Sequence, residues 1–217
     1  MDINLVIDYL ARWGHLLFGI TWIGLLYYFN FVQTEYFKEA DAPARVDAFV
    51  KLVPRALWYF RWGAMFTLLT GLIMLAYRHT GLTLDIVIGS TLGLLMFLNV
   101  WLIIWPNQKI LIASNTQIKG GGQALPDAAA AAPKAALASR TNALFSIPML
   151  FFMGSSTHFS HGMLTPGMGA LIAALIVIAV LEANAIFGKQ GPLTTIRGLI
   201  VSGLVLTAVL WAIVEVL

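Results

Sequence analysis

The stretch LDIVIGSTLGLLMFLNVWLIIW (Leu84–Trp105) decides the fold class of this chain. Apart from Asp85 near its start it carries no charge, and a helix needs about 20 mainly apolar residues to cross a bilayer. Further stretches of this kind occur along the chain, although the fourth is short. The sequence therefore predicts an all-α, polytopic membrane helix bundle. Its six predicted spans are residues 13–32, 57–77, 84–105, 142–157, 168–187 and 196–214.

The composition supports a single transmembrane domain over residues 1–217. Hydrophobic residues make up 59% of the chain and charged residues 11%, whereas soluble domains carry about 25% charged residues. The mean hydropathy is +0.84. There is no cysteine, which excludes disulfides, Fe–S clusters and a covalently attached c-type haem. The net charge of +3 is spread over loops, so we expect the lipid bilayer, and no nucleic acid, as a partner.

Lysine and arginine predict the orientation of the spans. They gather in the first, third and fifth connections, while the second carries only Arg78 and the fourth carries none. The positive-inside rule places the basic connections in the cytoplasm and both termini outside. The third connection contains KGGGQALPDAAAAAPKAA (residues 119–136), whose Gly, Ala and Pro content predicts a flexible cytoplasmic linker.

With this topology, every histidine lies at or just beyond the outer face of the membrane. The four are His15, His79, His158 and His161. Histidine is the commonest metal ligand among neutral side chains and a frequent axial ligand of haem iron. Trp13 and Phe159 add aromatic walls to this layer, and Arg12 or Arg78 could pair with propionates. These features predict haem b near the outer face, with copper or zinc held by three histidines as the alternative.

His15 is the strongest of these candidates because it lies inside a predicted helix. It shares a helical face with Gly19 and Trp22. A polar residue in such a place normally faces the bundle interior and is functional by default. Gly19 would let a flat macrocycle or another helix approach closely. His79 and His161, taken singly, are more readily explained as solvated loop residues.

A second group of polar side chains is predicted near the cytoplasmic ends of the spans. It comprises Asn30, Gln33, Arg61, Asn99, Arg140, Asn142, Glu182 and Asn184. One interpretation is a pocket for a planar organic anion. Its substrate-binding residues would be Arg61, Asn99, Arg140 and Glu182. The alternative is structural: Arg61 reaches the membrane surface and Glu182 forms an interhelical ion pair, since both are costly in hydrocarbon.

Four runs of the chain resemble the membrane-bound urate oxidase family, the PuuD-type urate hydroxylases. They are RWGHLLFGITWIGLLYYFNFVQ (Arg12–Gln33), PRALWYFRWGAMFTLLTG (Pro54–Gly71), IIWPNQK (Ile103–Lys109) and SRTNALFSIPMLFFM (Ser139–Met153). The last run leads into His158, where the family has a histidine shortly after the corresponding helix. The resemblance covers most of the chain and rests on these runs together.

The resemblance implies a multi-pass domain of the bacterial inner membrane that oxidises urate and passes electrons to cytochrome c. It implies His15 and His158 as haem or metal ligands, with His79, Arg12 and Trp22 as further cofactor-binding candidates. The family's C-terminal cytochrome c domain is expected to be missing here, since the chain has no cysteine. Electrons would then pass to a separate cytochrome c or respiratory-chain acceptor.

A looser H-x6-W-x-G pattern (His15, Trp22, Gly24) is similar to HemJ-type protoporphyrinogen oxidases, small membrane proteins that hold haem b. The leading hypothesis is therefore a membrane redox protein with haem b, and no catalytic residue is assigned. One alternative is a cofactor-free accessory subunit of a larger respiratory or transport complex. Another is an organic-anion permease, which is ranked last because only Pro148 interrupts a predicted span. A homo-oligomer or a larger membrane complex is the expected assembly.

Overall fold

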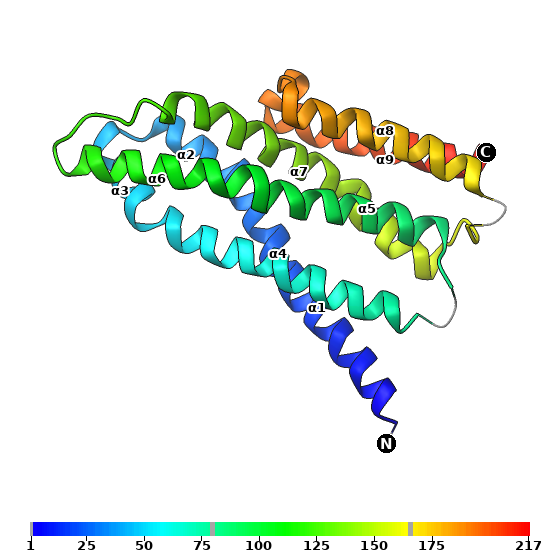
Figure 1. Cartoon of the computed structure of the whole chain (residues 1–217). Helices are drawn as coiled ribbons and strands as arrows, with labels where there is room; N and C mark the ends of the chain where they lie inside the picture. The colour runs from blue at the N-terminus through cyan, green and yellow to red at the C-terminus, as the bar shows by residue number, and fades with distance from the viewer. Residues whose placement is uncertain (1, 79–80, 165–166) are drawn as a thin grey trace. The chain divides into compact units, whose positions relative to one another are not determined.

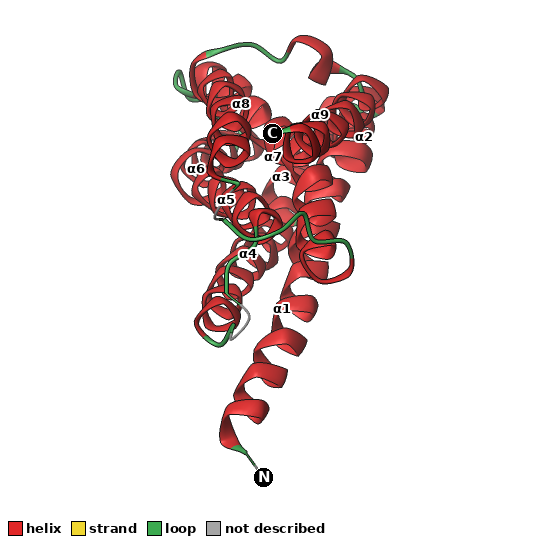
Figure 2. Ribbon diagram, turned by 90° about the vertical axis from the view of Figure 1, so that its right-hand side faces the viewer, coloured by secondary structure: helices red, strands yellow, loops and turns green. Residues whose placement is uncertain are grey.

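The computed structural model describes residues 2–78, 81–164 and 167–217, and these residues fold as helices joined by loops (Figures 1 and 2). The all-α prediction is confirmed. Six helical segments are long and apolar enough to cross a membrane. They are Ile3–Glu39, Val53–Ala76, Leu84–Lys119, Ala128–His158, Met168–Phe187 and Ile196–Val216. Large apolar side chains such as Ile20, Leu102 and Val180 are exposed on these helices, as expected of surfaces that face lipid.

The chain divides into two compact units. Unit 1 consists of Met1–Gly71 and Phe97–Ser139, and unit 2 of Leu72–Met96 and Arg140–Leu217. Helices α4 (Val53–Ala76) and α7 (Ala128–His158) each begin in unit 1 and end in unit 2. The two units are described separately below.

Unit 1 contains α1 (Ile3–Tyr27), α2 (Thr34–Glu39), α3 (Ala42–Lys51), most of α4 and α6 (Trp105–Lys119). Helices α1 and α3 begin at capping side chains: Asp2 accepts a hydrogen bond from the Asn4 amide, and Asp41 accepts one from the Ala44 amide. Helices α1 and α4 approach closely at Gly63. A Cβ atom there would lie 3.2 Å from the Trp22 backbone nitrogen, so a small residue is needed at this crossing.

Two π-helical segments also belong to unit 1. They are η1 (Tyr28–Gln33), which continues α1, and η2 (Asn99–Ile104), which joins α5 (Leu84–Leu98) to α6. Each contains a buried asparagine, Asn30 or Asn99. The wider backbone turn of a π-segment is frequent at functional sites, and hydropathy alone does not predict it.

Unit 2 contains α5, the greater part of α7, α8 (Met168–Phe187), the short η3 (Gly191–Thr194) and α9 (Ile196–Val216). Helices α8 and α9 run side by side (Figure 1). Helices α5 and α7 pack closely at Gly89, where a Cβ atom would lie 3.1 Å from the Met153 backbone nitrogen. The buried Asn142 side chain also joins them, by donating to the Met96 carbonyl at 2.8 Å.

Helix α7 begins at Ala128, inside the predicted linker 119–136, and runs without interruption through Pro148 to His158. The predicted fourth span, 142–157, is therefore the second half of a longer helix. Ala131 and Ala135 are buried, and alanine is the best helix former. Between α6 and α7, residues 120–127 are non-helical. The direction in which the termini face the membrane stays a prediction.

Candidate functional site

His15 lies on α1 in unit 1, and its ring is fixed by a backbone group of α4. Nδ1 lies 2.9 Å from the Thr67 carbonyl oxygen and 3.3 Å from the Thr70 hydroxyl. A carbonyl oxygen can only accept, so Nδ1 carries the hydrogen and donates it. In the neutral ring, Nε2 then keeps its lone pair. This is the arrangement of metal-ligating histidines, whose second ring nitrogen commonly donates to a carbonyl or carboxylate.

Two glycines leave space around this imidazole. A Cβ atom on Gly71 would lie 3.1 Å from His15 Cε1 and 3.3 Å from Nδ1, so glycine at position 71 lets the ring lie against α4. One turn along α1, a Cβ atom on Gly19 would have no neighbour within 4 Å. Glycine at these two positions adds no side-chain bulk to this part of α1 and α4. The His15 site, defined as His15, Thr67, Thr70, Gly71 and Gly19, therefore offers an oriented imidazole whose Nε2 could ligate haem iron.

The other predicted cofactor residues are placed differently. Trp22 is buried, and its indole Nε1 has no hydrogen-bond partner among the described residues. Arg12 is exposed and forms an ion pair with Asp8 at 2.8 Å. His158 is exposed at the end of α7 in unit 2, and His79 lies outside the described residues. Of the predicted ligands, His15 therefore has the local geometry that ligation requires.

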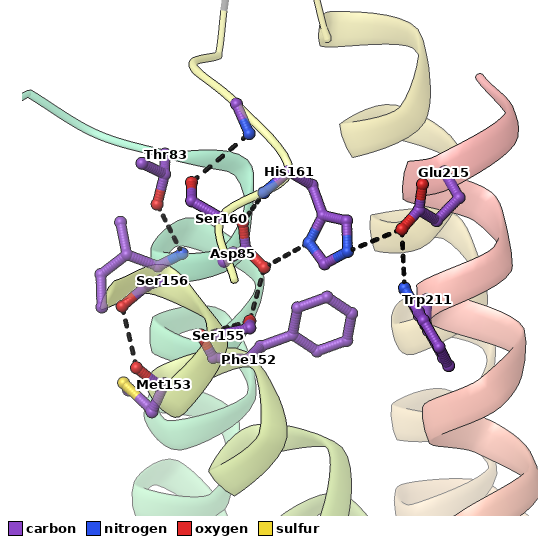
Figure 3. Close-up of polar contacts among 12 residues, drawn as sticks. Thr83, Asp85, Phe152, Met153, Ser155, Ser156, Ser160, His161, Trp211 and Glu215 are labelled. Carbon is purple, nitrogen blue, oxygen red and sulfur yellow. Dashed lines mark hydrogen bonds and ion pairs between the residues drawn. The ribbon is translucent and has the colours of Figure 1, made fainter. Parts of the chain in front are cut away.

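Unit 2 holds a second polar cluster, in which a buried carboxylate binds a buried imidazole (Figure 3). The Asp85 side chain is fully buried in the first turn of α5. Its Oδ1 accepts from the Ser155 hydroxyl at 2.5 Å and contacts His161 Nδ1 at 2.6 Å. Its Oδ2 accepts from the His161 backbone amide at 2.8 Å. The buried carboxyl group of Asp85 thus lies against the Ser155 hydroxyl, the His161 ring and the His161 amide.

The far side of the His161 ring faces helix α9. Nε2 lies 3.3 Å from Glu215 Oε1. The same oxygen accepts a hydrogen bond from the Trp211 indole at 3.0 Å. The rings of Phe152 and Phe159 flank the imidazole, with centroids 6.5 and 5.0 Å away. The His161 side chain is 5% exposed, against 47% for Glu215. We call Asp85, Ser155, His161, Trp211 and Glu215 the Asp85 cluster.

The loop after α7 places His161 in this cluster. Gly162 has φ of +100°, which glycine adopts without strain, and its carbonyl accepts from the Leu84 amide at 3.0 Å. An isolated β-bridge joins Thr83 to Met163. These backbone contacts fold the loop onto the start of α5. The sequence favoured a solvated His161, and the structure corrects that interpretation: the ring is buried. The signal that could have found it is Asp85, a lone carboxylate at the start of an apolar span.

Residues 80–214 match the family model of the urate oxidase N-terminal domain. The chain belongs to the urate oxidase N-terminal family. No curated protein and no solved structure matches the chain. Within this urate oxidase N-terminal-type chain, Asp85, Ser155 and His161 lie inside the matched region, His15 precedes it and Glu215 follows it.

The predicted substrate-binding residues of this urate oxidase relative are divided between the units. Arg61 and Asn99 belong to unit 1, and Arg140 and Glu182 to unit 2. Arg140 and Asn99 are buried. Glu182 lines a groove on α8 of about 450 Å³, whose other walls are mostly apolar.

Arg61 is the best defined of these four residues. Its guanidinium carbon lies 3.5 Å from the centroid of the Trp105 ring and 5.6 Å from that of Trp101, within cation–π range. Two buried polar atoms on the same stretch, Trp101 Nε1 and Gln108 Oε1, have no partner among the described residues. Arg61, Trp101, Trp105 and Gln108 form a basic aromatic cluster in unit 1.

The described residues contain no group of three or more His, Asp or Glu side chains arranged to hold a metal ion. The copper or zinc site built from three histidines therefore has no support in this part of the chain. Haem iron needs fewer protein ligands than a copper or zinc ion, because the porphyrin supplies four and the protein only one or two.

Proposed function

We propose that this chain is a redox protein of the urate oxidase N-terminal family that binds haem b through His15 Nε2. The observation that carries the proposal is the hydrogen bond from His15 Nδ1 to the Thr67 carbonyl at 2.9 Å. It leaves Nε2 as the unprotonated nitrogen and holds the ring in one orientation. A bond of this kind also raises the basicity of the ligating nitrogen.

Haem iron, when bound, supplies one-electron redox chemistry that no side chain of this chain offers. The residues around it would do three things. Thr67 would orient the ligand, Gly71 would leave room for the imidazole, and Gly19 would let the porphyrin edge approach α1. His158, in unit 2, is a separate candidate ligand that the family resemblance alone suggests. Its exposed position at the end of α7 supports that role less than the geometry supports His15.

Urate is the proposed electron donor, with the basic aromatic cluster as its binding site. Urate is a planar anion, so it could pair with the Arg61 guanidinium and stack on an indole ring. Trp101 Nε1 and Gln108 Oε1 would gain hydrogen-bond partners from its polar edge. The electrons would pass to a separate acceptor such as cytochrome c. The proposed location is the bacterial inner membrane, which follows from the resemblance and from the six apolar helices.

A reduced-minus-oxidised visible spectrum of the purified protein in mild detergent tests this proposal. We expect a haem b spectrum, and we expect anaerobic urate to reduce it. Arg61→Ala should weaken reduction by urate and leave reduction by dithionite unchanged. Lys109→Ala is the matched control, because Lys109 is exposed and its amine lies farther from the Trp105 ring, at 5.6 Å. A colourless protein from haem-replete cells that copurifies with a stoichiometric partner would instead establish the accessory-subunit alternative.

The permease alternative makes a different prediction. Urate would accumulate in proteoliposomes that contain the protein, and Arg61→Ala would abolish this uptake. The π-helical segments η1 and η2 supply two irregular helices in unit 1, which a transporter would use at its binding site. A bound haem with no urate uptake separates the redox protein from the permease.

A further inference from the structure

His161 connects a fully buried carboxylate to a half-exposed one. On one side the ring contacts Asp85 Oδ1 through Nδ1 at 2.6 Å, and on the other Nε2 faces Glu215 Oε1 at 3.3 Å (Figure 3). Helices α5 and α9 supply the two carboxylates, and the loop after α7 supplies the imidazole. This order of groups leads from the exposed edge of unit 2 to its interior.

The hydrogen bonds fix which nitrogen can take up a proton. An ionised Asp85 can only accept, so His161 Nδ1 carries a hydrogen. Nε2 is buried, and its contact with Glu215 lies outside hydrogen-bond geometry. While Nε2 is unprotonated, it is itself an acceptor and faces the Glu215 carboxyl oxygen, so no hydrogen bond forms between them. Once Nε2 is protonated, the ring lies between two carboxyl groups, with Asp85 Oδ1 2.6 Å from Nδ1 and Glu215 Oε1 3.3 Å from Nε2.

Ser155 gives the buried end of this chain two alternative hydrogen bonds. Its hydroxyl lies 2.5 Å from Asp85 Oδ1 and 3.2 Å from the Phe152 carbonyl oxygen. When Asp85 is ionised, Ser155 donates to it. When Asp85 is protonated, the serine hydrogen can turn to the Phe152 carbonyl and the serine oxygen can accept from the new carboxylic acid. The Ser155 hydroxyl thus has a hydrogen-bond partner in both protonation states of Asp85 without movement of a helix.

We propose that Glu215, His161 and Asp85 form a proton path from the surface of unit 2 to a buried, proton-binding carboxylate. A proton from water adds to Glu215 and passes to His161 Nε2. The Nδ1 proton then moves to Asp85 Oδ1, and the ring is left as the neutral Nε2–H tautomer. One proton enters and one carboxylate is neutralised, so no further reactant is needed. Chains of Asp, Glu and His are the usual proton relays of membrane proteins.

The surroundings of the imidazole suit such a path. Asp85 and Glu215 are the charged groups that the described residues place against it. Arg78 is engaged elsewhere, since it donates to the Gly81 carbonyl at 2.7 Å and the Ser156 carbonyl at 3.4 Å. Helix α7 contributes Ser155 and Phe152, and the first turn of α8 carries no acidic residue. The rings of Phe152 and Phe159 lie beside the imidazole, whose side chain is only 5% exposed.

Infrared difference spectroscopy after a rapid drop in pH tests the path in the full-length protein in lipid nanodiscs. We expect the C=O band of a buried carboxylic acid to grow, to shift in D2O, and to be missing in Asp85→Asn. In His161→Asn, whose amide keeps a donor near Asp85, the band should grow at least about tenfold more slowly, because positioned proton transfer contributes 10²–10⁴-fold. Thr157→Ala, at an exposed residue near the end of α7, is the control and should keep the wild-type rate.

Two results would overturn the proposal. One is that no Asp85-dependent band forms at any pH at which the circular dichroism spectrum stays native. The other is that the band grows at the wild-type rate in His161→Asn. If His161→Asn does not fold, Glu215→Gln provides the same rate test from the exposed end of the path. It keeps an acceptor for the Trp211 indole at position 215. An unchanged rate in that variant would also contradict the path.

Discussion

At the scale of single residues, the functional argument depends on which nitrogen of each histidine carries a hydrogen. His15 donates from Nδ1 to a backbone carbonyl, and His161 donates from Nδ1 to a carboxylate. The first environment leaves Nε2 free to ligate, while the second places the ring between the carboxyl groups of Asp85 and Glu215. Two histidines of one chain are thus suited to different chemistry by their partners.

The burial of His161 and Asp85 predicts a measurable difference between two neighbouring serines. Ser155→Ala removes one of the donors to the buried Asp85 carboxylate, which should lower the free energy of unfolding by about 1–3 kcal/mol. Ser156→Ala removes a hydroxyl that bonds to the Met153 carbonyl of its own helix, so it should change little. Chemical denaturation in detergent, followed by circular dichroism, measures both. An equal loss of unfolding free energy in the two variants would show that the Ser155 hydroxyl does not stabilise the buried Asp85.

The sequence could identify His15 but not His161, for a physical reason. His15 lies within a helix, where spacing alone relates it to Gly19 and Trp22. The burial of His161 depends on the conformation of a loop, including the positive φ of Gly162. No helical or strand period encodes that conformation. The hydrogen bond to the Thr67 carbonyl was likewise unpredictable, because it depends on how α1 packs against α4.

At the scale of elements, the α1–α4 crossing is held close by Gly63. Gly63→Ala would bring a methyl group within 3.2 Å of the Trp22 nitrogen and 3.4 Å of the Phe18 carbonyl oxygen. Backbone atoms cannot move aside as a side chain can, so we expect a loss of about 1–3 kcal/mol. Gly24→Ala, where a Cβ atom has no neighbour within 4 Å, is the control and should be neutral or stabilising. A stable Gly63→Ala protein would argue against this close packing.

Helices α3 and α6 are joined by charges that predict a pH dependence. Asp47 binds Lys119 at 2.6 Å and Lys51 at 2.8 Å, and the hydrogen bond from Lys119, followed by that from Lys51, lowers the pKa of Asp47. The folded state therefore favours the ionised carboxylate. The stability that the ionised Asp47 contributes is complete above the usual aspartate pKa. It is lost as the pH falls through the lowered pKa that Asp47 has in the folded state.

Hydrogen exchange of the α3 amides measures this contribution. At pH 7, Asp47→Asn should exchange faster than the wild type, and the difference should shrink as the pH falls below the usual aspartate range. Added salt should reduce it as well, because the pair is exposed. Glu39→Gln, which changes another exposed carboxylate, serves as the control. A difference that is independent of pH would mean that Asp47 does not act through its charge.

The spans illustrate what hydropathy can and cannot predict about an element. The predicted span 168–187 coincides with α8, because both of its ends are marked by a change from apolar to polar residues. Helix α7 was predicted too short because its first turns are alanine-rich and lie beside glycine and proline in the sequence. That composition resembles a linker, but Ala131 and Ala135 are buried. The π-helical segments depend on hydrogen-bond register, which apolar residues do not reveal.

At the scale of the whole molecule, composition was sufficient to predict the all-α fold class and helices long and apolar enough to cross a membrane. The six apolar helices and the match of residues 80–214 to the urate oxidase N-terminal domain agree with what the sequence predicts. The division into two units was not predicted, because no linker marks it: the division falls within α4, α5 and α7. The predicted substrate-binding residues therefore lie in different units, Arg61 and Asn99 in unit 1 and Arg140 and Glu182 in unit 2.

The ratio of haem to protein chain in the wild type and in His15→Ala, measured by pyridine haemochrome on purified protein, tests the central claim most directly. Thr70→Val is the matched control, since it removes a hydroxyl 3.3 Å from the same ring nitrogen and leaves the Thr67 carbonyl in place. We predict about one haem b per chain in the wild type and in Thr70→Val, and almost none in His15→Ala. Equal haem content in all three proteins would contradict the assignment of His15, and no haem in the wild type would contradict the redox function itself.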